Sequence, residues 1–103
     1  MLKESKKHRL QDLIEKIGQA DDMVKKHSSN PSKFMLEQYE AKKEKLLGYL
    51  IDELVDASIR SPYSFKLIQL ALKRFYPKLM KPGNNSLHNK HYKELKELEA
   101  VLI

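Results

Sequence analysis

Apolar residues recur at steps of three and four over the first quarter of the chain, which is the spacing of one helix face. Charged and amide side chains occupy most of the positions between them and would face water. The pattern predicts a helix over residues 4–27 with a single apolar face. The apolar positions are Leu10, Leu13, Ile14, Ile17, Ala20, Met23 and Val24.

A second helix is predicted over residues 31–58. Asn30 can accept hydrogen bonds from the free N–H groups of its first turn, and Pro31 suits a first helical position, where no amide donor is needed. The second half of this helix is apolar around most of its circumference, which is typical of a helix with partners on several sides. Because only a short turn separates it from helix 4–27, the two helices should form a long antiparallel hairpin.

Two shorter helices are predicted in the second half of the chain. Ser61 and Pro62 repeat the chemistry of a cap followed by a first-turn proline, and they begin a helix over residues 62–76. A run rich in Pro, Gly and Asn then marks a loop. A last helix follows over residues 86–103, with an apolar stripe and a charged outer face.

These elements predict an all-α fold and one helical domain over residues 1–103, a small bundle in which the two shorter helices pack on the hairpin. Each hairpin helix spans about 38 Å at 1.5 Å per residue, so the shorter helices cannot cover both of its faces. A second copy of the chain, related by twofold symmetry, is the commonest cover for such a surface, and we expect a homodimer. Residues 1–9 are expected to form a basic arm that frays.

Composition narrows the class of protein. With 103 residues, 41% of them hydrophobic, the chain is long enough to bury a core of its own. It has no Cys, which excludes disulfides, thiol catalysis and Cys-based zinc sites. No apolar run approaches the roughly 20 residues of a membrane span, and no signal-peptide core follows the basic start. We therefore expect a soluble cytoplasmic protein that does not bind membranes.

Catalytic chemistry has little support in the sequence. No nucleophile elbow, phosphate-binding glycine loop or His-Glu-x-x-His motif is present. His88 and His91 lie three residues apart and are weak candidates for a metal site, which would need three or four ligands. Asp52 and Asp56 share a helix face and are interpreted as a solvated polar strip unless a partner chain adds ligands. We expect no enzymatic activity, no cofactor and no bound metal.

The net charge of +6 is concentrated in one segment. Residues 58–82 carry six basic residues and no acidic residue, and the rest of the chain sums to zero. A basic row on helix 62–76 could neutralise phosphates, or it could meet the acidic side chains of helix 31–58 within one chain or across a dimer. The sequence leaves both possibilities open. The candidate phosphate-binding residues are Arg60, Lys66, Lys73, Arg74, Lys78 and Lys81.

The function predicted from these features is that of a non-catalytic helical module for protein–protein interaction or assembly, acting as a homodimer or with another protein. Its binding surface is expected on the apolar second half of helix 31–58 and on the stripe of helix 62–76. The predicted residues are Leu46, Leu47, Leu50, Ile51, Leu54, Phe65, Ile68 and Leu72. The alternative is a nucleic-acid-binding or nucleic-acid-associated regulatory protein that uses segment 58–82.

Overall fold

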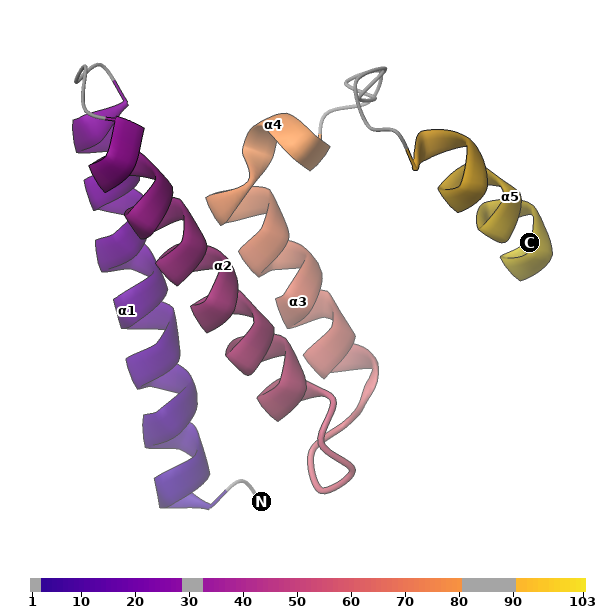
Figure 1. Ribbon diagram of the computed structural model, residues 1–103. Helices are drawn as coiled ribbons and strands as arrows, with labels where there is room; N and C mark the ends of the chain where they lie inside the picture. Colours follow the sequence, from indigo (N-terminus) through magenta and orange to yellow (C-terminus); the bar gives the residue numbers. More distant parts are fainter. Residues whose placement is uncertain (1–2, 29–32, 81–90) are drawn as a thin grey trace.

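Helices are the only regular elements in the computed structural model, which describes residues 3–28, 33–80 and 91–103. α1 and α2 run antiparallel and pack along their length, and α3 lies against α2 (Figure 1). The predicted all-α hairpin bundle is therefore confirmed. The helices are α1 (Glu4–His27), α2 (Lys33–Leu54), α3 (Pro62–Phe75), α4 (Pro77–Met80) and α5 (Tyr92–Leu102).

The core of the bundle lies where α1, α2 and the end of α3 meet. Ile17 of α1 and Leu50 of α2 are fully buried at its centre. The core residues of α1 and α2 follow the three- and four-residue spacing of the sequence pattern, so each helix turns one face to the other. Covering a Leu or Ile side chain contributes about 1.5–3 kcal/mol. The core comprises Leu13, Ile17, Leu47, Leu50, Leu54 and Phe75.

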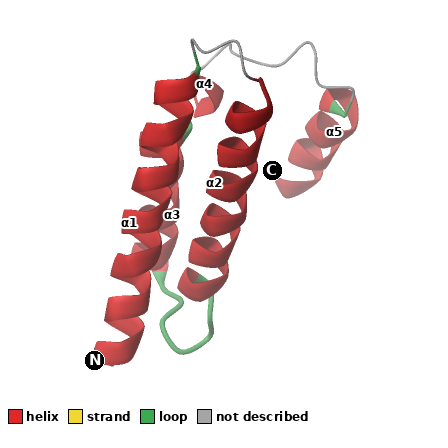
Figure 2. Cartoon of the chain, turned by 60° about the vertical axis from the view of Figure 1, so that its left-hand side comes forward, coloured by secondary structure: helices red, strands yellow, loops and turns green. Residues whose placement is uncertain are grey.

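α2 ends at Leu54, four residues before the predicted boundary. The backbone then turns, and the N–H groups of Ile59 and Arg60 both donate to the carbonyl oxygen of Asp56. The Ser58 hydroxyl donates to the Asp56 carboxylate at 2.5 Å within the same turn. This turn reverses the chain so that α3 runs antiparallel to α2 (Figure 2).

The start of α3 has the predicted cap. The Ser64 N–H donates to Ser61 Oγ at 3.2 Å, and the Ser61 N–H donates to Ser64 Oγ at 2.8 Å. The backbone N–H groups of Ser61 and Ser64 therefore both have a hydrogen-bond partner. Pro62 occupies the first helical turn, where an amide donor is not needed. The corresponding cap predicted at Asn30 and Pro31 lies outside the described residues.

Pro77 determines the end of α3. A proline disfavours helical geometry in the residue before it, and Tyr76 has φ −134° and ψ 53°, outside the helical region. α3 accordingly ends at Phe75, one residue before the predicted boundary. Pro77 then begins the short helix α4, which the sequence pattern does not predict.

α5 shows the largest departure from the predicted arrangement. The prediction packs helix 86–103 on the hairpin, whereas the described helix begins at Tyr92, and residues 86–90 lie outside the described part of the chain. α5 contacts none of the other described helices and stands apart from them in Figures 1 and 2. The described bundle therefore consists of the hairpin, α3 and α4.

Candidate interaction surface

An apolar groove runs between α1 and α3, with α2 as its floor. Leu50 and Leu54 of α2 form the floor, and the residues that rise on either side come from the two flanking helices. The groove has a volume of about 190 Å³, and a neighbouring depression extends it toward Tyr63 at the start of α3. Its walls are formed by Leu10, Ile14, Leu67, Leu70, Ala71, Arg74 and Phe75.

Three large apolar side chains of this groove remain open to water. Ile14 is 42% exposed, Leu67 is 39% exposed and Leu70 is 50% exposed. Scattered apolar residues on a surface are common, but these three line a single concave site. A contiguous apolar patch bordered by charged residues is typical of a binding surface.

The residues predicted for binding divide into three groups by burial. Leu47, Leu50 and Leu54 are buried in the core of the same chain, so most of the apolar surplus of α2 is used in folding. A second group is partly buried against that core and comprises Leu46, Ile51, Ile68 and Leu72. Phe65 is half exposed. The large apolar side chains of the groove that remain exposed therefore come from α1 and α3, and not from α2.

Ile14, Leu67 and Leu70 are absent from the set of binding residues predicted from the sequence. Each belongs to an apolar helical stripe, and the stripe alone does not show which of its members the neighbouring helix covers. The usable signal is the width of the stripe on α3, because Leu67 and Leu70 extend it beyond the arc that one neighbouring helix can cover.

The basic residues predicted for phosphate binding lie on the exposed surface of α3 and its flanks. The Nζ of Lys66 lies 5.4 Å from the centre of the Tyr63 ring. Lys78 lines a charged depression together with Glu40 and Glu44 of α2. The exposed residues are Arg60, Lys66, Lys73, Arg74 and Lys78, and Lys81 lies outside the described residues.

A buried ion pair joins α1 to α2 at the end of α3. Lys43 and Asp21 are each 7% exposed, and Lys43 Nζ lies 2.8 Å from Asp21 Oδ1. Lys43 also donates to the Phe75 carbonyl oxygen, and its Nζ lies 4.2 Å from the centre of the Tyr76 ring. Burial raises the pKa of Asp21, but hydrogen bonds from Lys43 and Lys25 outweigh this effect and hold the pKa below its ordinary value. Three helices therefore meet at one lysine.

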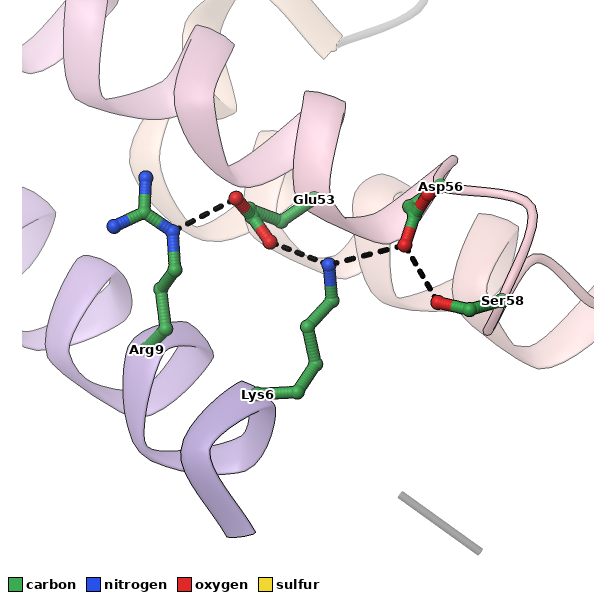
Figure 3. Close-up of polar contacts among 5 residues, drawn as sticks. All are labelled: Lys6, Arg9, Glu53, Asp56 and Ser58. Atoms are coloured by element: carbon green, nitrogen blue, oxygen red, sulfur yellow. Dashed lines mark hydrogen bonds and ion pairs between the residues drawn. The ribbon is translucent and has the colours of Figure 1, made fainter. Parts of the chain in front are cut away.

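A second cluster of charges ties the start of α1 to the end of α2 (Figure 3). Lys6 pairs with both Glu53 and Asp56, and Arg9 Nε lies 2.7 Å from Glu53 Oε1. The hydrogen bond from Lys6, and then the one from Arg9, lowers the pKa of Glu53. Residues 4–9 are thus helical and attached to α2, which differs from the frayed basic arm that the sequence predicts.

The weak metal candidates are not assembled into a ligand set within the described residues. His91 Nδ1 lies 3.8 Å from Glu94 Oε2, and both side chains are exposed. His88 lies outside the described residues. No group of three or more His, Asp or Glu that could hold a metal occurs in the described ranges. Asp52 is exposed, and Asp56 contacts Lys6, in keeping with a polar strip.

None of the helices that the structure describes is both long enough and apolar enough to cross a membrane. No protein-family model, curated protein or solved structure matches the chain.

Proposed function

We propose that the protein is a non-catalytic helical assembly module that associates with a second copy of itself through the apolar surface of α1 and α3. The observation that supports this proposal is the exposure of Ile14, Leu67 and Leu70 in one groove. Covering a side chain of this size contributes about 1.5–3 kcal/mol when burial is complete, so a partner that fills the groove is favoured. Twofold symmetry presents the same groove on both copies, which doubles the contact.

The test is the molar mass of the chain in solution, measured by sedimentation equilibrium over a wide concentration range. We expect the wild type to dimerise and the variant L67E/L70E to remain monomeric, because two carboxylates would be buried in the apolar contact. Phe34→Glu is the matched control, since Phe34 is exposed on α2 outside the groove. Circular dichroism verifies that each variant remains folded. A monomeric wild type, or loss of the dimer in F34E as well, would overturn the proposal.

Nucleic-acid binding is the second candidate function, and the charge of α3 favours it. Lys66, Lys73 and Arg74 are exposed on a helix without an acidic residue, and Lys66 lies over the ring of Tyr63, which is itself 65% exposed. Fluorescence anisotropy with single- and double-stranded DNA and RNA across a salt series tests this function. Salt-sensitive binding that K66E/K73E removes would support it, and absence of binding at low salt would overturn it.

A further inference from the structure

α5 carries an apolar stripe that no other described helix covers. Leu95, Leu98 and Leu102 are three and four residues apart and so lie on one face of this helix. Leu98 is 58% exposed and Leu102 is 87% exposed, and α5 has no contact with α1, α2 or α3. The same chain therefore presents an open apolar groove and an open apolar helix face.

The groove and α5 agree in length. The 11 residues of α5 rise about 16 Å at 1.5 Å per residue. The wall that α3 contributes extends from Tyr63 to Phe75, which is about 18 Å of helix. The position between α1 and α3, opposite α2, is also the one that a fourth helix occupies in a four-helix bundle. A helix as long as α5 would complete that arrangement.

Basic residues border the groove on both sides. On α1, Lys7 lies on the helix face that carries Leu10, because it precedes Leu10 by three residues, and Lys3 is the residue just before the first turn of the helix. On α3, Lys66 and Lys73 are seven residues apart and border the wall formed by Leu67 and Leu70. All four lysines are exposed. An occupant with acidic flanks would complement this groove in charge.

α5 has acidic residues in the matching positions. At the spacing of a helix, Glu94 and Glu99 lie on opposite sides of the leucine stripe. The far face carries Lys93, Lys96, Glu97 and Ala100. The helix thus combines an apolar centre with two acidic borders, and the groove combines an apolar centre with two basic borders.

We infer that α5 of one copy docks into the α1–α3 groove of a second copy, so that two chains exchange their C-terminal helices. The inference rests on the proposed self-assembly and names the segment that performs it. A second copy is the favoured source of the helix because α5 stands away from the groove of its own chain (Figure 1). Reciprocal exchange fills both grooves and covers both leucine stripes in one closed, twofold-symmetric dimer.

Substitutions on α5 separate this inference from the proposed function. In the full chain, L98E/L102E should be monomeric by sedimentation equilibrium, whereas A100E, on the far face of the same helix, should dimerise like the wild type. A dimer that persists in L98E/L102E would overturn the exchange and leave the proposed function standing. A monomeric A100E would also overturn the exchange. A monomeric wild type would overturn both.

A disulfide test identifies the chain that supplies α5. The protein has no Cys, so K73C and E99C, at the borders of the groove and of the leucine stripe, can be introduced without competing thiols. When the two single variants are mixed and oxidised, we expect a disulfide between different chains. When one chain carries both substitutions, we expect linked dimers as well. A disulfide closed within a single chain would show that α5 occupies its own groove, and this result would overturn the exchange.

Discussion

Lys43 Nζ lies 2.8 Å from Asp21 Oδ1, in a nearly covered ion pair that joins α1 to α2 where α3 ends. Burying two charges is costly, and the cost is offset here because Lys43 also donates to the Phe75 carbonyl while Asp21 also accepts from Lys25. The contacts of Lys43 with Asp21 and with the Phe75 carbonyl depend on how α1, α2 and α3 are aligned. We therefore interpret the pair as a device that sets the alignment of the bundle around the groove.

Removing the lysine of this pair should destabilise the fold. Lys43→Met leaves the Asp21 carboxylate buried without its main partner, and we expect the free energy of unfolding in urea to fall by about 3 kcal/mol. Lys42→Met is the matched control, because Lys42 is the exposed neighbour on the same helix, and it should change stability by less than about 0.5 kcal/mol. Similar losses in both variants would contradict this account of the pair.

Asp21 should also give the fold a measurable acid dependence. Its pKa in the folded chain lies below the ordinary value of 3.8, so the unfolded chain takes up the proton first as the pH falls. The stability that the carboxylate supplies is present in full above pH 3.8 and is lost as the pH falls through the folded-state pKa.

Urea unfolding at a series of acidic pH values measures this dependence. The wild type should lose stability with falling pH more steeply than Asp21→Asn, which cannot take up that proton. Asp22→Asn, at the exposed neighbouring position, controls for the loss of one negative charge. Equal slopes for the wild type and D21N would show that the pair does not act in this way.

The charge cluster of Figure 3 should protect the start of α1 from local opening. Glu53→Gln removes the carboxylate that Lys6 and Arg9 share, so hydrogen exchange of the amides in the first turns of α1 should accelerate by roughly threefold, a modest effect typical of a partly exposed pair. Glu37→Gln, at an exposed site on α2, should leave these rates unchanged. Unchanged protection in E53Q would argue against anchoring of the helix start.

The cap of α3 should contribute measurably to the free energy of unfolding. Ser61→Ala removes the hydroxyl that accepts the Ser64 N–H, and stability in urea should decrease by about 1 kcal/mol. Ser5→Ala, at an exposed position in the first turn of α1, is the control and should lie within about 0.5 kcal/mol of the wild type. If S61A matched S5A, the cap would not contribute to the stability of α3.

Helix positions were predictable because they depend on local chemistry. The apolar spacing of α1 and the Ser61–Pro62 start of α3 are both visible in the sequence and both confirmed. The end of α2 was not predictable, because no Pro or Gly follows Leu54 before Pro62 and the turn is closed by backbone hydrogen bonds to the Asp56 carbonyl oxygen. The burial of Lys43 was not predictable either, because it is one of several charged residues on α2 and its partners come from two other helices.

The candidate surface was predictable only in outline. An excess of apolar residues on α2 and α3 is evident from the sequence, but its division into core and surface depends on how the helices cross. Leu50 and Leu70 are both leucines in apolar segments of predicted helices, yet Leu50 is buried and Leu70 is half exposed. The open stripe of α5 was likewise not predictable, because the same pattern would suit a helix packed on its own hairpin.

Self-association of the folded chain is the central claim, and its molar mass in solution is the most direct test. Sedimentation equilibrium of the 103-residue chain should show a shift with concentration from 12.1 kDa toward twice that mass, and L67E/L70E should stay at 12.1 kDa throughout. A wild-type chain that remains at 12.1 kDa up to its solubility limit would contradict the account.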